Sequence, residues 1–313
     1  MGITVSETIR AAWETLTKAE KKVAHAILSG YPLSALGSIS DLSDKAHVST
    51  ATITRFVCRL GYPGFIAFRE TLRGEVAEQF RSPIDKQRAL STTAPLDGSG
   101  FLGLMKEVSG HIGESVGQIQ EADFKYVVSI LSDRSRRIFL AGGRMTRSVM
   151  AHLATTLHAM RSDVHMLDAG TVDAAEQIID MRPKDVLVAM DVRRYQRGAI
   201  ELARVAAAKG CVIILITDEW ISPISTNANV IFALKVGTDS IWDSLALPLL
   251  FGEALINAVG LEIWPTAQLR LRELEGHWST WMTFEGSEPG SMESEDVGRL
   301  ALEATKDKSP DKA

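Results

Sequence analysis

The sequence predicts an α/β protein in which an all-α N-terminal domain is followed by a doubly wound, parallel, five-stranded α/β domain. Before residue 80, apolar residues recur three and four positions apart, which is typical of amphipathic helices. From Arg136 onward, five short apolar runs rich in Val and Ile alternate with helical stretches, and this alternation predicts a parallel sheet covered on both faces. A chain of 313 residues is long enough for two such domains.

Two helices are predicted at the start of the chain. Residues 4–15 carry Val5 and Ile9 on one side at helical spacing. Thr17 and Glu20 have the spacing of a capping box, in which each side chain bonds the backbone of the other. We therefore expect a second helix to begin here and to end near Gly30.

The N-terminal domain is organised around residues 40–61, which predict two short helices joined by a tight turn at His47 and Val48. The Ser49 hydroxyl is placed to cap the second helix, and Gly61 is placed to end it. Four apolar residues of that helix fall at i, i+3, i+4 and i+7, and they predict a buried stripe: Ile53, Phe56, Val57 and Leu60.

The opposite face of the second helix carries small hydroxyl residues followed by arginines. Hydroxyls can approach base edges and phosphates, and arginine can donate two bonds to guanine, so this face suits the major groove of DNA. A helix-turn-helix is one interpretation, and an ordinary helical hairpin with a solvated face is the other. The candidate DNA-binding residues are Ser49, Thr50, Thr52, Thr54, Arg55 and Arg59.

The stretch from Leu16 to Leu72 resembles the N-terminal domain of the RpiR/MurR family of bacterial transcriptional regulators. The family pattern VS-x-x-T-x-x-R-F-x-x-x-LG-x-x-GF is present from Val48 to Phe65, and only the usual glycine- or asparagine-like turn position differs, as His47. The resemblance implies binding to a double-stranded DNA operator.

Residues 81–100 are rich in Ser, Thr, Pro and Gly, and they are predicted to be a linker. A helical stretch is expected over residues 101–132, with an apolar stripe suited to a partner domain or a second subunit. Strands are predicted within 136–142, 163–168, 185–192, 211–218 and 229–236, and helices over 144–161, 171–181, 196–209, 222–228 and 242–260. Ligands of such sheets bind beyond the carboxyl ends of the strands.

Residues 136–260 resemble the SIS (sugar isomerase) domain that the RpiR family carries as its sensor, most closely from Ile216 to Leu234. The resemblance implies binding of a carbohydrate derivative. We expect a helix-turn-helix domain over 1–80, a linker over 81–100, a sensing and oligomerisation domain over 101–262, and a partly disordered extension over 263–313. Within that extension, a helix after Leu261 is expected, and disorder beyond about Phe284.

The phosphate-binding motifs of SIS domains are altered in this sequence. The family motif G-x-G-x-S after the first strand corresponds here to Gly142–Thr146, with Arg144 in place of the second glycine. The motif S-x-S-G-x-T after the third strand corresponds to Asp191–Gln196, and its serines, glycine and threonine are all replaced. Arginines in these loops predict a pocket for an acidic or phosphorylated small molecule, because guanidinium groups bind carboxylate and phosphate in pairs of hydrogen bonds.

The candidate effector-binding residues are Gly143, Arg144, Thr146, Asp191, Arg193, Arg194, Tyr195, Thr217, Trp220 and Trp242. Other interpretations remain open at this stage. The arginines suit a solvated loop or an ion cluster at a dimer interface, and the tryptophans suit a core or an interface. Asp243 suits a helix cap as well as a ligand contact.

The charge of the chain is unevenly distributed. Residues 1–81 hold 10 Lys and Arg against 8 Asp and Glu, or +2, while the remainder holds 24 against 31, or −7, which together give the net charge of −5. A weakly basic module binds DNA modestly, because affinity scales with the number of phosphates neutralised. We therefore expect a homodimer or homotetramer that reads two half-sites.

Other classes of function have little support in the sequence. The seven histidines show no metal-ligand spacing, so neither a metal nor a cofactor is expected. A SIS-type phosphosugar isomerase is the alternative from a different class, with Glu219 and Glu253 as the available bases, and a SIS domain used only for assembly is a third. The sequence contains no long apolar run or signal layout, and Cys58 and Cys211 are unpaired by spacing, so we expect no membrane partner and a cytoplasmic location.

Overall fold

The N-terminal part of the chain is all-α. The computed structural model describes residues 4–29, 31–93 and 100–281. The helices of this part are α1 (Val5–Ala12), α2 (Lys18–Leu28), α3 (Ile39–Ala46), α4 (Thr50–Arg59) and α5 (Phe65–Phe80). The predicted capping box is present at the start of α2, where the Thr17 hydroxyl accepts from the Glu20 N–H and the Glu20 carboxylate accepts from the Thr17 N–H.

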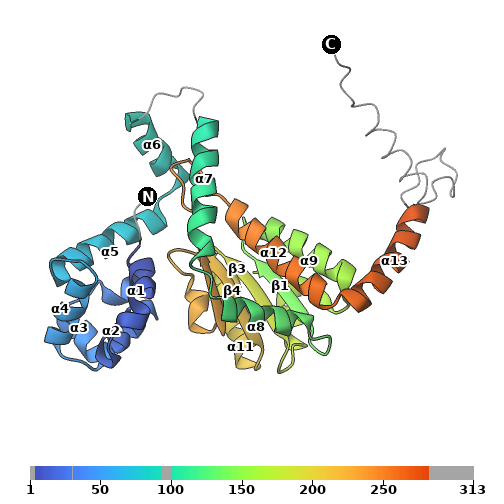
Figure 1. The fold of residues 1–313 in the computed structure, drawn as a ribbon, viewed down its shortest axis with the longest axis horizontal. Helices are drawn as coiled ribbons and strands as arrows, with labels where there is room; N and C mark the ends of the chain where they lie inside the picture. The colour runs from blue at the N-terminus through green and yellow to red at the C-terminus, as the bar shows by residue number, and fades with distance from the viewer. Residues whose placement is uncertain (1–3, 30, 94–99, 282–313) are drawn as a thin grey trace, which may run out of the picture. The chain divides into compact units, whose positions relative to one another are not determined.

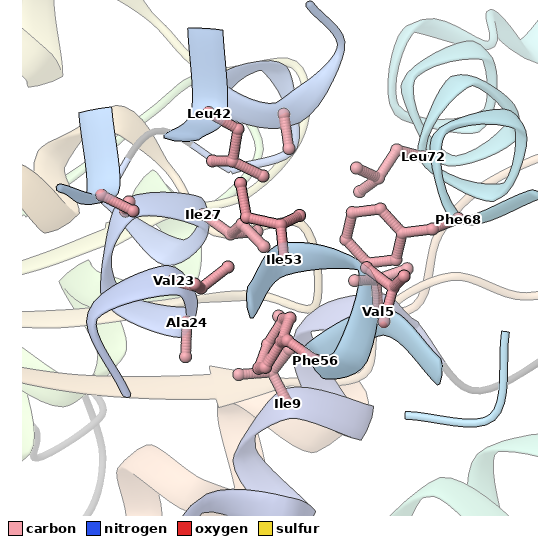
Figure 2. Close-up of a cluster of buried hydrophobic side chains, with 14 of the residues drawn as sticks. Val5, Ile9, Val23, Ala24, Ile27, Leu42, Ile53, Phe56, Phe68 and Leu72 are labelled. Carbon is pink, nitrogen blue, oxygen red and sulfur yellow. The ribbon is translucent and has the colours of Figure 1, made fainter. Parts of the chain in front are cut away.

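One hydrophobic core holds these helices together (Figure 2). Ile53 and Phe56 of α4 are fully buried in it, and so is Val57. They meet Val23 and Ile27 of α2, together with side chains from α1, α3 and α5. The predicted stripe is thus the inner face of α4, and Leu60 packs against the same core while partly exposed.

The turn between α3 and α4 has a left-handed residue at its centre. His47 ends α3 with φ 52° and ψ 49°, a conformation that glycine and asparagine adopt most easily. The Ser49 side chain then accepts from the Thr52 N–H and caps α4, as predicted. Gly61 follows α4 with φ 92°, which is the left-handed C′ position that the sequence indicates.

Along the chain, three helices follow the N-terminal helical core and precede the first strand of the sheet. Most of the predicted linker is helical, as α6 (Pro83–Thr93), and residues 94–99 lie outside the described part of the chain. The prediction of one helical stretch over 101–132 is wrong in its continuity, because α7 (Gly100–Val116) and α8 (Glu121–Ser132) are separate helices. Its apolar stripe is largely exposed, with Leu102, Met105 and Val116 each more than half accessible.

All five predicted strands are present in one parallel sheet: β1 (Ile138–Gly142), β2 (Val164–Asp168), β3 (Val186–Asp191), β4 (Val212–Asp218) and β5 (Val230–Leu234). The strand order is β2-β1-β3-β4-β5, and the register places Ile138 beside both Val164 and Val186. The carboxyl ends of all five strands therefore lie along one edge of the sheet, where the order reverses between β1 and β3.

Helices cover both faces of the sheet: α9 (Arg147–Met160) and α12 (Ala246–Glu262) on one, α10 (Val172–Ile179) and α11 (Arg197–Ala208) on the other. Figure 1 shows α9 and α12 together, with α11 across the sheet from them. Strand residues alternate between the two layers, so Phe139 and Ala141 pack with α10 and α11. The predicted doubly wound fold is confirmed, although residues 222–228 form only a short 3₁₀ turn, Pro223–Thr226.

The turn from β1 into α9 brings two backbone segments unusually close. A Cβ atom at Gly142 would lie 2.8 Å from both the Arg147 nitrogen and the Thr146 carbonyl carbon. At Gly143 the nearest atom would be the flexible Gln196 side chain, at 3.4 Å. Only glycine therefore fits at position 142 without moving the turn.

The last described helix, α13 (Trp264–Trp281), belongs to a compact unit separate from residues 1–263. It confirms a helix after Leu261, while the segment predicted to be disordered lies outside the described residues. Within the described ranges, no single helix is long and apolar enough to cross a bilayer; α12 and α13 meet that test by length and composition only when taken as a pair.

Replacing His47 tests whether its left-handed backbone conformation costs stability in the turn between α3 and α4. We expect His47→Val to lower the free energy of unfolding by about 1–2 kcal/mol, because a β-branched residue fits the left-handed region poorly. His47→Gly should be neutral or slightly stabilising. The measurement is the protection of α3 and α4 amides from hydrogen exchange in urea, and equal protection in both variants would contradict the assignment.

Replacing Gly142 tests the β1–α9 turn. Gly142→Ala should lower the free energy of unfolding of the α/β region by about 1–3 kcal/mol, since the added methyl group meets backbone that cannot move aside. Gly143→Ala is the matched control and should cost less than half as much. Urea unfolding of the two variants followed by circular dichroism compares them directly, and a reversed order would refute this account.

Candidate functional site

The outer face of α4 is solvent-exposed, as the helical spacing predicts. Thr50, Thr54, Arg55 and Arg59 are all exposed, and Thr52 is half-buried at the margin. The Ser49 and Thr52 hydroxyls lie 2.9 Å apart at the helix start. This face is free of core contacts, so the DNA-binding prediction remains compatible with the geometry.

The two arginines of this face differ in their surroundings. Arg59 donates to the Thr15 carbonyl at 2.8 Å and pairs with the Glu20 carboxylate at 3.2 Å, so it fastens α4 to α2. Within the described part of the chain, Arg55 forms no hydrogen bond or ion pair. Arg55 is therefore the cation of α4 whose side chain is available to a nucleic acid.

A cavity of ≈ 340 Å³ lies beyond the carboxyl ends of β1 and β3, at the reversal of strand order. Four segments form its wall: the turn after β1, the loop after β3, the segment before α12, and the start of α6 with the residues preceding it. The lining residues are Arg81, Pro83, Lys86, Gly143, Arg144, Met145, Thr146, Asp191, Val192, Arg193, Arg194, Gln196, Ile241, Trp242, Asp243 and Leu245.

The predicted effector-binding residues divide into two groups. Those that line the cavity are Gly143, Arg144, Thr146, Asp191, Arg193, Arg194 and Trp242. The other three, Tyr195, Thr217 and Trp220, lie outside its lining and support the loops from behind.

The Thr146 hydroxyl has a structural task in the β1–α9 turn. It accepts from the Gly143 N–H at 2.8 Å and donates to the Met190 carbonyl at 2.7 Å, both in buried surroundings. It thereby joins the turn after β1 to the end of β3. Arg144, between Gly143 and Thr146, projects from this turn and is exposed.

The end of β4 and the segment that follows it hold Asp191 in place. Thr217 is fully buried and donates to the Asp191 carbonyl at 2.8 Å, while the Ser222 hydroxyl donates to the Asp191 carboxylate at 2.5 Å. Burial raises the pKa of Asp191 to about 7, and the bond from Ser222 offsets only part of that effect. The Thr217–Ser222 stretch thus acts as a brace for the loop after β3.

Arg193 is fully engaged by the protein itself. Its guanidinium pairs with both carboxylate oxygens of Asp243, with 2.6 Å between Nε and Oδ2. The guanidinium carbon lies 4.1 Å from the ring centre of the buried Trp220, in a cation–π arrangement, and Nη1 donates to the Glu78 carbonyl at 2.6 Å. Trp220 therefore serves as a platform for Arg193 and not as an exposed aromatic wall.

Asp243 also binds a lysine from the predicted linker. Lys86 Nζ lies 2.6 Å from Asp243 Oδ1 and 3.1 Å from the Thr238 carbonyl oxygen. Burial alone would raise the pKa of Asp243, but hydrogen bonds and positive charge from Arg193 and Lys86 lower it overall. The prediction that Asp243 caps a helix is wrong, because α12 begins at Ala246 without a side-chain cap.

A second buried network continues behind the cavity. The Tyr195 hydroxyl donates to Asp218 Oδ1 at 2.6 Å, and Asp218 Oδ2 accepts from the Arg193 N–H at 2.5 Å. Asp218 and the adjacent Glu219 have raised pKa values because both are buried, and Glu219 accepts from the Val236 and Gly237 N–H groups. These carboxyl groups therefore organise loops and do not face the cavity.

Two cations of the cavity wall remain available. Arg144 and Arg194 are exposed, and neither makes an ion pair or hydrogen bond within the described ranges. Trp242, 56% exposed, lies on the same wall and offers an apolar surface beside them. Across the same ranges, no group of three His, Cys, Asp or Glu residues is arranged to hold a metal ion. The arrangement suits an anion with an apolar or ring-like body.

Sequence reasoning missed the contribution of Arg81 and Lys86 to this cavity. Both lie in the segment predicted to be a linker, more than 50 residues before β1. No local pattern marks Lys86, because its partner Asp243 is 157 positions away in the chain, and Arg81 pairs locally with Glu78. Only the folded arrangement places them at the ends of the strands.

Comparisons with known proteins agree with this architecture. Residues 3–79 match the helix-turn-helix domain of the rpiR family, and residues 130–258 match the SIS domain. The chain is 25% identical over 228 residues to an uncharacterized HTH-type transcriptional regulator of Haemophilus influenzae, which covers 72% of this chain and 77% of that one. It is also 25% identical over 256 residues to another from Clostridium perfringens, covering 76% and 88%.

The α/β region has the fold of a solved relative. The crystal structure of the sugar isomerase domain of an RpiR transcription factor from Sphaerobacter thermophilus superposes with a TM-score of 0.54 at 18% identity, covering 56% of this chain and 98% of that one. Since the helix-turn-helix and SIS domains follow one another in a single chain, the protein belongs to the rpiR family of DNA-binding transcriptional regulators.

Proposed function

We propose that this regulator binds its operator through α4 and responds to a small, multiply charged anion in the cavity beyond β1 and β3. The observation that carries the proposal is a pair of arginines, Arg144 and Arg194, on the wall of a cavity at the reversal of strand order; neither has a partner among the described residues. Such a position is where ligands bind in parallel α/β sheets. The cavity volume of ≈ 340 Å³ suits a small metabolite.

The charge of the cavity wall supports an anionic ligand. Five lining residues carry positive charge: Arg81, Lys86, Arg144, Arg193 and Arg194. Two lining residues are acidic, Asp191 and Asp243, and the raised pKa of Asp191 reduces its negative charge near neutral pH. The wall therefore has an excess of at least three positive charges, which a phosphate ester, a sugar acid or a dicarboxylate would neutralise.

Binding without catalysis fits this site better than isomerisation does. Glu219 binds backbone N–H groups away from the cavity, and Glu253 pairs with His152 on the outside of α9 and α12. Asp191 is the carboxyl group at the wall with a pKa near 7, and the Ser222 hydroxyl holds it in place. We therefore propose that Asp191 accepts a ligand hydroxyl, and an isomerase assay with phosphosugars should show no turnover.

The DNA-binding half of the proposal requires more than one chain. The N-terminal 81 residues carry a charge of only +2, so a single copy would neutralise few phosphates. Two copies that read half-sites about one helical turn apart would multiply the contact area. We accordingly propose a homodimer or homotetramer acting in the cytoplasm, with sedimentation equilibrium as the test of assembly.

Arg55→Ala should weaken operator binding by about 5- to 100-fold, because one arginine pairing with a guanine is worth about 1–3 kcal/mol. The DNA is a sequence selected from a random pool by the unaltered protein, and affinity is measured by fluorescence anisotropy at fixed salt. Arg73→Ala is the matched control, since Arg73 is exposed on α5 and pairs with Glu70. If Arg55→Ala binds the operator as tightly as the unaltered protein does, the placement of α4 in the major groove is wrong.

An acidic metabolite should stabilise the protein against heat. At 100 times its dissociation constant, a ligand that binds only the folded state adds about 2.7 kcal/mol. The screen covers phosphosugars, sugar acids and dicarboxylates, and the stabilisation should be reduced in Arg144→Ala and Arg194→Ala. These variants should melt like the unaltered protein when no ligand is present, because neither arginine has a partner to lose.

Two further variants separate binding from structure in that screen. Arg193→Ala should lower the melting temperature even without ligand, because it removes the bidentate partner of the Asp243 carboxylate and a bond to the Glu78 carbonyl. Arg134→Ala is the matched control, since Arg134 is exposed before the start of β1, at the other edge of the sheet. A ligand that stabilises Arg144→Ala and Arg194→Ala as strongly as the unaltered protein would refute the proposed site.

A further inference from the structure

The segment from Glu78 to Lys86 connects the DNA-binding core to α6 and also forms part of the cavity wall. It runs from the end of α5, the last helix of the DNA-binding core, into α6. Arg81, Pro83 and Lys86 of this segment line the cavity, although they precede the SIS domain in the chain. An occupant of the cavity would therefore touch the segment that leads to the DNA-binding domain.

Three anchors attach this segment, here named the tether (residues 78–86), to the loops of the sheet. The first is the bond from Arg193 Nη1 to the Glu78 carbonyl oxygen, 2.6 Å long. This carbonyl group, at the C-terminal end of α5, also accepts from the Arg81 N–H at 3.1 Å, and positive charge is favoured at that end of a helix.

The second anchor is the side chain of Gln79. It is 95% buried and lies next to Tyr195, whose hydroxyl donates to Asp218. Among the described residues, Gln79 Oε1 has no hydrogen-bond partner, so this anchor is held by packing against the Tyr195–Asp218 network at the carboxyl end of β4. Close packing of a buried side chain favours one position of the tether.

The third anchor is Lys86, which is almost completely buried. Its ammonium group binds Asp243 and the Thr238 carbonyl. Asp243 is at the same time the carboxylate partner of Arg193. One negative charge therefore serves two buried cations, whose side chains are 7% and 2% exposed.

This cluster of Lys86, Arg193 and Asp243 has an excess of one positive charge. The carboxyl groups of Asp218 and Glu219 also favour the charged form of Arg193, so part of this excess is already offset, and an anion in the cavity would offset more of it. The cavity opens directly on all three residues and also on Arg81 of the tether. An anion in the cavity would meet positive charge from the tether on one side and from Arg144 and Arg194 on the other.

We infer that the ligand of the proposed effector site is a further counterion of this cluster, and that its binding fastens the tether onto the SIS domain. This inference rests on the proposed function, and it adds the direction of the response. The bound anion bridges the tether and the loops after β1 and β3, and it stabilises the attached position. The anchoring of α5, and with it of the DNA-binding core, thereby depends on occupancy of the cavity.

Hydrogen exchange of the full chain tests the inference, with inorganic phosphate as the probe and chloride keeping the ionic strength constant. Binding is first measured independently by thermal shift. At about nine times the dissociation constant of phosphate, amides of residues 78–88 should exchange about tenfold more slowly, because opening must await release of the anion. Amides of α2, within the DNA-binding core, are the internal reference and should change less than twofold.

Two variants give the test its specificity. Asp243→Asn removes the shared carboxylate, so the tether should exchange faster without phosphate and should regain protection when phosphate is added. Lys86→Met leaves one positive and one negative charge in the cluster, on Arg193 and Asp243. Phosphate should therefore slow exchange of the tether much less than in the unaltered protein. Lys125→Met is the matched control, because Lys125 is an exposed lysine of α8 paired with Glu121, and it should respond like the unaltered protein.

The possible outcomes distinguish failure of the inference about the tether from failure of the proposed effector site. Phosphate that binds, depends on Arg144 and Arg194, and leaves tether exchange unchanged overturns the inference while the effector site stands. Equal slowing in the tether and in α2 would mean general stabilisation, and it also overturns the inference. Failure of phosphate and of every anion in the thermal-shift screen to bind overturns both.

Discussion

The carboxylate of Asp243 joins three segments that lie far apart in the chain. It binds Arg193 from the loop after β3 and Lys86 from α6, while Arg193 rests on Trp220 and reaches the Glu78 carbonyl. Most of the cavity geometry depends on this arrangement, because it fixes the loop after β3 against the segment before α12. Without that carboxylate, two buried cations would lie side by side with only carbonyl oxygens and the Trp220 ring as partners, so its loss should loosen this corner of the site.

The fold was largely predictable because it depends on local and periodic signals. The five strands are short Val- and Ile-rich runs, and the stripe of Ile53, Phe56 and Val57 has helical spacing, so both are visible in the sequence. The break between α7 and α8 was missed, since the residues around it keep the apolar spacing of one helix. Of the two interpretations of Asp243, the helix cap was wrong; it was considered because Asp before an apolar run is a common helix start.

The site was only partly predictable, for a different physical reason. Motif positions after β1 and β3 pointed to Arg144 and Arg194, since those strands end at the same edge of the sheet. The roles of Arg193, Tyr195 and Trp220 depend on partners between 23 and 115 positions away, and no local pattern encodes such pairs. Lys86 and Arg81 come from outside the SIS domain altogether, so a search confined to that domain could not include them.

Residues 81–86 form part of the cavity wall, and this affects where the chain can be cut or joined to a domain of another protein. A fragment that begins at the start of the SIS match would keep the whole sheet and yet lack two of the five cations around the cavity. Likewise, a chimera that exchanges the N-terminal domain together with α6 would replace part of the proposed ligand site with that of its donor. If the cavity is that site, exchange of the DNA-binding domain leaves it whole only when the junction lies before Glu78.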